Sequence, residues 1–206
     1  MIRLSQLKPA YFIPVALIIA IGLVIALLGP KTQEVSGDDA KTRVTDGRHY
    51  YIFIRSLEVA PKKPSGKPWD RGDEAPDLFY EVHWRDNEVF ASSTQRNQLI
   101  GNWSPLGVDT MNAIREGRIG IDSVIHAAAI RASQSETFEL RIYDSDAVSR
   151  DSIAMLSFSF SELKEGDNVF SYEQREDNSV THLRLAVVDA DLPLVGQLEQ
   201  IMNPSS

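Results

Sequence analysis

The stretch FELRIYDSDAVSRDSIAML, residues Phe138–Leu156, shows which kind of fold to expect from this chain of 206 residues. Its first half alternates apolar and polar residues, and its second half leads into another alternating run at Ile153–Phe160. Alternation with a period of two is typical of half-buried strands. Between the two runs the chain turns through an acidic segment that carries Asp144, Asp146 and Asp151.

The same kind of pattern recurs along most of the chain after residue 48. Strands are expected at His49–Val59, Leu78–Trp84, Glu88–Ser92, Ile119–Arg131, Thr137–Tyr143, Ile153–Phe160, Asn168–Tyr172 and Thr181–Val188. A short turn, Arg85-Asp86-Asn87, joins the second and third of these into a hairpin. About eight short strands separated by turn signals predict an all-β, antiparallel sandwich over residues 48–190.

Two segments depart from this strand pattern. Asp109–Glu116 could form one or two helical turns with Asp109 as the N-cap. Within the C-terminal tail, residues 191–206, the run Leu192–Met202 has helical spacing. We expect this helix either to lie against the sandwich or to lead to a partner.

The N-terminal part of the chain predicts a membrane segment. Ala10–Leu28 reads AYFIPVALIIAIGLVIALL and contains no charged residue. At ~1.5 Å per residue this run spans roughly 28 Å, about the thickness of a bilayer hydrocarbon core. We expect residues 10–28 to be one transmembrane helix, an uncleaved signal anchor after a short flank at residues 1–9. The alternative is a cleaved signal peptide, whose apolar region is usually shorter and ends at a small-x-small site.

The flanks of this helix predict its orientation. Arg3 and Lys8 precede it, and a short basic N-terminus usually stays in the cytoplasm. Residues 29–47 are polar and lack hydrophobic periodicity, so they are expected to be a tether. The chain is therefore predicted to be a single-pass membrane protein whose C-terminal domain is extracytoplasmic.

Composition and motifs exclude several classes of function. A net charge of -8 provides no basic stripe for phosphates, so a nucleic acid partner is not expected. The chain has no cysteine, and its four histidines do not form a His-Glu-x-x-His zinc motif. A Gly-x-Ser-x-Gly nucleophile elbow is also lacking. We therefore expect a protein that is not an enzyme.

Four segments in order carry a family resemblance. They are Pro76–Val82, Arg141–Asp146 with Asp151–Ala154, Ser157–Leu163 and Thr181–Val188. The first is similar to the segment after the first calcium loop of C2 domains, the calcium- and phospholipid-binding β-sandwiches. The second resembles the third loop of that family, and the others resemble its next strand with a Ser-Glu-Leu turn and its closing strand. The resemblance covers roughly Tyr50 to Asp189 and implies an eight-stranded C2-like β-sandwich.

The resemblance also implies a set of calcium ligands. They would be Asp70 and Asp77 from the first loop and Asp144, Asp146 and Asp151 from the third, with Asp73 as a substitute for Asp70. Oxygen ligands of this kind suit Ca²⁺, and five clustered carboxylates repel one another without a cation. The competing hypothesis is that these aspartates only form turns through bonds to nearby backbone amides.

Trp69 and Val148 fall at the tips of the two acidic loops. They are candidates for insertion into a membrane, although Trp69 could instead fold back onto the edge of the sandwich. The preferred hypothesis is a membrane-anchored, calcium-responsive binding module that docks to a membrane surface or a protein partner. The alternative is a calcium-independent structural or interaction domain within a membrane-bound assembly.

Overall fold

The computed structural model describes residues 42–70, 74–103, 112–114, 116–118, 126–146 and 149–202. Outside these residues lie the predicted transmembrane helix, its N-terminal flank and residues 29–41 of the predicted tether. Asp73 and Val148 also lie outside them. Within the described part of the chain, no helix is long and apolar enough to cross a membrane.

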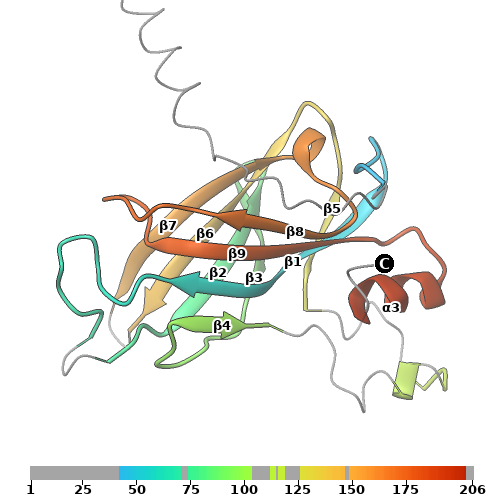
Figure 1. Cartoon of the computed structure of the whole chain (residues 1–206). Helices are drawn as coiled ribbons and strands as arrows, with labels where there is room; N and C mark the ends of the chain where they lie inside the picture. The colour runs from blue at the N-terminus through green and yellow to red at the C-terminus, as the bar shows by residue number, and fades with distance from the viewer. Residues whose placement is uncertain are drawn as a thin grey trace, which may run out of the picture. The chain divides into compact units, whose positions relative to one another are not determined.

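Strands dominate the described residues (Figure 1). They are β1 (His49–Val59), β2 (Leu78–Trp84), β3 (Asn87–Ala91), β4 (Ile100–Asn102), β5 (Ala128–Arg131), β6 (Thr137–Ser145), β7 (Arg150–Ser159), β8 (Gly166–Ser171) and β9 (Val180–Asp189). One antiparallel sheet has the order β4-β1-β9-β8, with β5 also paired to β1. The other antiparallel sheet has the order β3-β2-β6-β7.

The main hydrophobic core draws on strands of both sheets, as expected for a sandwich. On β6 its buried members alternate, at Phe138, Leu140 and Ile142. One hydrogen bond crosses between the sheets, since the hydroxyl of Tyr80 on β2 accepts from the backbone N–H of Ile54 on β1 at 3.2 Å. The expected all-β antiparallel sandwich is therefore confirmed.

The strand number and some bounds differ from the expectation. The described residues contain nine strands rather than eight, because β4 is too short to show alternation. β1 and β2 have the predicted bounds, whereas the run predicted at Ile119–Arg131 is a described strand only from Ala128. Residues 119–125 lie outside the described part. The predicted hairpin is present, and its two central residues, Arg85 and Asp86, both have positive φ, as a type I′ turn requires.

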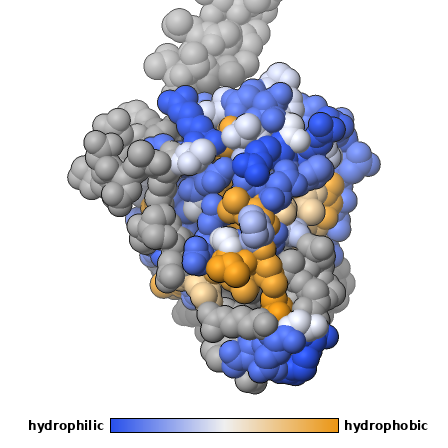
Figure 2. Space-filling model, turned by 90° about the vertical axis from the view of Figure 1, so that its right-hand side faces the viewer, coloured by the Kyte–Doolittle hydropathy of each residue, from blue (hydrophilic) through white to orange (hydrophobic). Residues whose placement is uncertain are grey.

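The helical tail forms as predicted and packs on the sandwich. Helix α3 (Leu194–Met202) places Leu198 and Ile201 in a second apolar cluster with Phe53 of β1 and Val188 of β9. The side-chain carbonyl of Gln200 accepts from the backbone N–H of Asp189 at 2.9 Å. Figure 2 views the side of the domain on which α3 lies and shows a mostly hydrophilic surface with an apolar strip at its centre.

Two short helical turns complete the described structure. The 3-10 turn η3 (Phe160–Glu162) follows β7 and is capped by the Ser159 hydroxyl, which accepts from the Ser161 N–H. Residues 112–114 are helical, within the helix predicted at Asp109–Glu116, but its other residues except Glu116 lie outside the described part.

Candidate metal centre

Three carboxylates converge where the loop between β1 and β2 meets the turn between β6 and β7. Asp70, Asp144 and Asp146 each offer one oxygen, and these oxygens all lie within 4.8 Å of one another. Asp70 belongs to the first loop, whereas Asp144 and Asp146 lie at the end of β6 and just beyond it. Two segments far apart in the sequence therefore share one small volume.

Asp144 is buried because it continues the inward side of β6. Phe138, Leu140 and Ile142 face the core at every second position, and Asp144 occupies the next one, with an exposed fraction of 0%. Its Oδ1 accepts from the backbone N–H of Asp77 at 2.8 Å. Its buried Oδ2 has no hydrogen-bond partner among the residues that the structure describes.

This environment disfavours the charged form of Asp144. Burial is the largest cause that raises the pKa of its carboxyl to about 6, and the charges of Asp70 and Asp146 act in the same direction. The hydrogen bond from Asp77 and the charge of Lys63 oppose the shift. Burial, followed by the nearby carboxylate of Asp146, also raises the pKa of Asp70. A cation placed among these oxygens would relieve the cost of ionisation.

Asp77 joins the two loops through its backbone and its side chain. Its carbonyl oxygen accepts from the N–H of Ser145 at 2.9 Å, next to the cross-strand pair formed by Leu78 and Asp144. Its Oδ1 accepts from the N–H of Asn97 at 2.8 Å. One oxygen of Asp77 is thus used as a turn former, although its charge still raises the pKa of Asp70.

Asp151 lies opposite Asp144 in the register of β6 and β7, but its side chain is bound elsewhere. Its Oδ2 forms an ion pair of 2.8 Å with the Nζ of Lys63, and about half of the Asp151 side chain (51%) is exposed. The same ammonium lies 5.6 Å from the ring centroid of Trp69. The hydrogen bond to Asp151 raises the pKa of Lys63. Among the described residues, Lys63 therefore supplies positive charge to this group of aspartates.

Trp69 does not project towards solvent. Its exposed fraction is 5%, and its indole Nε1–H donates to the carbonyl of Ala60 at 2.8 Å. The expectation that Trp69 inserts into a membrane is corrected, because an indole in the core with its N–H satisfied is not available to lipid. The alternative, Trp69 folded back onto the sandwich, describes the structure. Val148, the other insertion candidate, lies outside the described residues.

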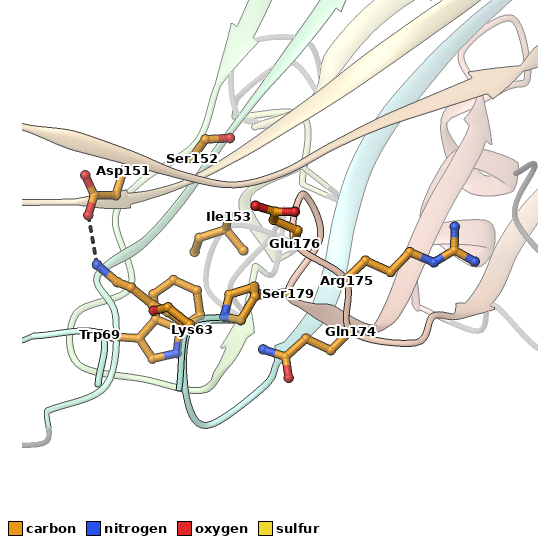
Figure 3. Close-up of a pocket in the computed structure, with 11 residues that line it drawn as sticks. Lys63, Trp69, Asp151, Ser152, Ile153, Gln174, Arg175, Glu176 and Ser179 are labelled. Carbon is orange, nitrogen blue, oxygen red and sulfur yellow. Dashed lines mark hydrogen bonds and ion pairs between the residues drawn. The ribbon is translucent and has the colours of Figure 1, made fainter. Parts of the chain in front are cut away.

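An open pocket of about 720 Å³ lies beside the acidic loops (Figure 3). Lys63, Trp69 and Asp151 line one side, and Gln174, Arg175 and Glu176 of the connection between β8 and β9 line the other. The Nε2 of Gln174 donates to the carbonyl of Lys62 at 2.7 Å and so ties that connection to the first loop.

Of the residues that line this pocket, sequence reasoning singled out Trp69 and Asp151 but missed Lys63 and the connection between β8 and β9. Lys63 is one of several lysines in a polar loop, and loops have no periodicity from which the direction of a side chain can be read. The connection between β8 and β9 shows no motif of its own.

No protein-family model and no curated protein matches the sequence. Solved structures do resemble the fold. One is a C2 domain with 11% identity and a TM-score of 0.44, which covers 68% of this chain and 97% of that one. Another holds the two C2 domains of extended-synaptotagmin 2, calcium bound, with 14% identity and a TM-score of 0.44. This match covers 70% of this chain and 47% of the extended-synaptotagmin 2 chain. A C2 domain protein from Ramazzottius varieornatus has 11% identity, a TM-score of 0.41 and coverage of 73% and 92%.

The chain thus spans about half (47%) of the extended-synaptotagmin 2 structure and nearly all of the two single domains. These neighbours are C2 domains, the family that the acidic loops resemble. Matches of this strength say nothing about ligands, so any function must be argued from the residues themselves.

Proposed function

We propose that this domain is a binding module whose docking depends on Ca²⁺ held by Asp70, Asp144 and Asp146. The observation that supports the proposal most strongly is the buried Oδ2 of Asp144, which has no hydrogen-bond partner among the described residues. Two further carboxylate oxygens lie within 4.8 Å of the Asp144 carboxylate. A buried carboxylate oxygen without a partner carries a penalty that a cation would remove.

The donor set fits calcium on chemical grounds. Ca²⁺ takes about six to eight oxygens in flexible geometry, and carboxylates can bind it through one oxygen or two. Asp70 and Asp146 lie in loops and are partly or fully exposed, so they can adjust around the fixed carboxylate of Asp144. Asp77 is a further candidate donor, because its backbone N–H contacts the Asp144 carboxylate and the described hydrogen bonds of its side chain use only Oδ1.

The charge at this edge of the sandwich links calcium to docking. Residues 60–77 and 144–151 carry seven acidic and five basic side chains, so the loops by themselves have a net negative charge that disfavours an anionic surface. Bound Ca²⁺ would supply positive charge and open coordination positions for phosphate oxygens. The adjoining pocket adds cationic or amide donors from Lys63, Gln174 and Arg175. A membrane surface with anionic headgroups is therefore the partner that we propose, and a carboxylate-bearing protein is the alternative.

The proposal retains the sequence-based expectations for the rest of the chain. Residues 10–28 would anchor the protein in the membrane, the domain would lie outside the cytoplasm, and it would act without catalysing a reaction. Alkaline carbonate extraction tests the anchor, and protease digestion of intact and permeabilised cells tests the orientation. Release of the chain at alkaline pH would contradict the anchor.

A calcium-independent interaction domain is the second candidate. Two contacts favour it, since Asp151 is bound to Lys63 and Asp77 is bound to the N–H of Asn97. Both aspartates therefore serve the fold without a metal. Under this hypothesis the aspartates only stabilise the loops at this edge of the sandwich, and the affinity for a partner does not change with calcium.

Vesicle tethering separates the two candidates. The whole chain is reconstituted into phosphatidylcholine vesicles, and its tethering of phosphatidylserine vesicles is followed by light scattering in Ca²⁺ and in EGTA. We expect tethering in Ca²⁺ only, its loss in the double variant Asp144→Asn/Asp146→Asn, and no loss in Asp86→Asn, which alters an exposed turn away from the site. Equal tethering in EGTA would favour the second candidate, and no tethering in either condition would contradict docking to an anionic membrane.

A further inference from the structure

A second group of side chains that could hold a metal ion lies on the outer face of the sheet that contains β2. Glu81 and His83 are two residues apart on β2, and Glu88 lies on the neighbouring strand β3. One ligand atom from each of these residues lies within 4.8 Å of the others. The cluster differs from the acidic loops because it includes an imidazole, and the function proposed above does not use it.

The hairpin register brings Glu88 to this cluster. Trp84 pairs with Asn87 at the turn, so the next pair is His83 with Glu88, and directly opposed residues share one face of the sheet. A β-bulge follows this pair, because Val82 pairs with Phe90 and Val89 is the extra residue.

Glu81 is an unusual residue on this face because it is charged and almost completely buried. Its exposed fraction is 6%. The even-numbered residues of β2, such as Tyr80 and Val82, face the core, so Glu81 points to the opposite side of the sheet. Its Oε1 accepts from Arg150 at 2.7 Å, and its Oε2 lies 2.9 Å from the Nε2 of His83. Arg150 also stacks over the ring of Phe79 at 4.8 Å and so helps to cover this carboxylate.

These contacts leave a suitable set of donors for a metal. Arg150 occupies one oxygen of Glu81 and holds the carboxylate in place, as supporting groups do around metal ligands. The other oxygen faces the imidazole, and the exposed carboxylate of Glu88 can reach both because it lies directly across from His83. The two glutamates and Arg150 together carry one net negative charge, which favours the entry of a divalent cation.

We infer that Glu81, His83 and Glu88 form a binding site for Zn²⁺ on the outer face of the sheet, separate from the acidic loops. Imidazole and carboxylate ligands suit Zn²⁺ at about 2.0–2.2 Å, which places neighbouring ligand atoms about 3.3–3.6 Å apart in a tetrahedron. The Nε2 of His83 and the Oε2 of Glu81 are 2.9 Å apart, slightly closer than that value, and all three ligand atoms lie within 4.8 Å of one another. Three protein ligands leave the fourth position open to water or to a donor from a partner.

Calorimetry with ZnCl₂ tests this inference on the whole chain, purified without a tag in non-ionic detergent and metal-free buffer. The wild type is expected to bind one Zn²⁺ at this site, and His83→Ala and Glu88→Gln are expected to weaken that binding by at least about tenfold. His182→Ala is the matched control, because His182 also lies near a glutamate, Glu58 at 3.2 Å, but on an exposed surface. Circular dichroism confirms that each variant is folded, and Glu88 is exposed, so its amide is expected to be tolerated.

Zinc could also enter the acidic loops, and a second variant separates that outcome. Asp144→Asn/Asp146→Asn is expected to keep the zinc binding that His83→Ala loses, and Co²⁺ in the wild type is expected to give the intense visible absorption of a tetrahedral site with an imidazole ligand. The inference is overturned if the wild type binds no Zn²⁺. It is also overturned if His83→Ala binds Zn²⁺ as the wild type does. Failure of the calcium proposal would leave these results unchanged, since the two sites share no residue.

Discussion

Replacing Asp144 with Asn should stabilise the calcium-free domain at neutral pH. The Asp144 carboxyl has a pKa of about 6 in the folded protein against an ordinary 3.8, mainly because it is buried. Between these two values the folded state holds a proton that the unfolded state has lost, so stability falls as the pH rises from 3.8 to about 6. Above about pH 6 the folded state bears the full free-energy cost of the ionised Asp144 carboxylate. A difference of about 2 pKa units makes this cost roughly 3 kcal/mol of unfolding free energy.

The asparagine variant removes this penalty and keeps the local hydrogen bond. Its amide oxygen can still accept from the N–H of Asp77, and its NH₂ group can donate to the carboxylates of Asp70 and Asp146. For a folded unit of this size, about 3 kcal/mol corresponds to a rise in Tm of roughly 6–12 °C.

Thermal melts followed by circular dichroism in EGTA measure this effect on the whole chain. The gain in Tm is expected to be largest above about pH 7 and to shrink as the pH falls towards the ordinary carboxyl pKa. Asp86→Asn, an exposed turn substitution, should leave Tm unchanged. A lower Tm for Asp144→Asn at neutral pH, or a gain that does not depend on pH, would refute the reasoning.

Three further predictions follow from the same contacts. Calcium affinity should fall below about pH 6, because Asp144 must lose its proton to bind the ion. Titration calorimetry at several pH values measures this, and an affinity that does not change with pH would contradict it. Lys63→Met should raise calcium affinity several-fold, because it removes a positive charge from the site and releases Asp151 from its ion pair. A weaker calcium affinity in calorimetry would show instead that Lys63 supports the site. Trp69→Ala should lower stability by about 3–5 kcal/mol in both Ca²⁺ and EGTA, since the ring is in the core; a chemical denaturation curve like that of the wild type would contradict its burial.

Much of the fold could be predicted because its signals are local and periodic. The sequence indicates the bounds of β1 and β2 to the residue, although both strands contain five consecutive buried residues, at 50–54 and 78–82, and so alternate only in part. β4, at Ile100–Asn102, has only three residues, which is too few to show a period. The helical spacing of the tail predicted α3, but only the structure shows that it covers Phe53 and Val188 on the outer face of a sheet.

The candidate site could be predicted only in part, because it depends on which way loop side chains point. The convergence of Asp70 with Asp144 was expected from a family resemblance, since no local pattern links residues so far apart. The alternation of β6 can explain afterwards why Asp144 is buried. The pairing of Asp151 with Lys63 could not be read from the sequence, since polar loops have no periodicity.

The central claim is that the carboxylates around Asp144 hold calcium, and a calcium-dependent melt of the whole chain tests it most directly. Ca²⁺ at about a hundredfold excess over its Kd should stabilise the folded state by roughly 2.7 kcal/mol. For this domain that corresponds to a rise in Tm of about 5–11 °C. The account predicts this rise for the wild type and its loss in Asp144→Asn/Asp146→Asn. An unchanged Tm in millimolar Ca²⁺, or the same rise in the double variant, would contradict it.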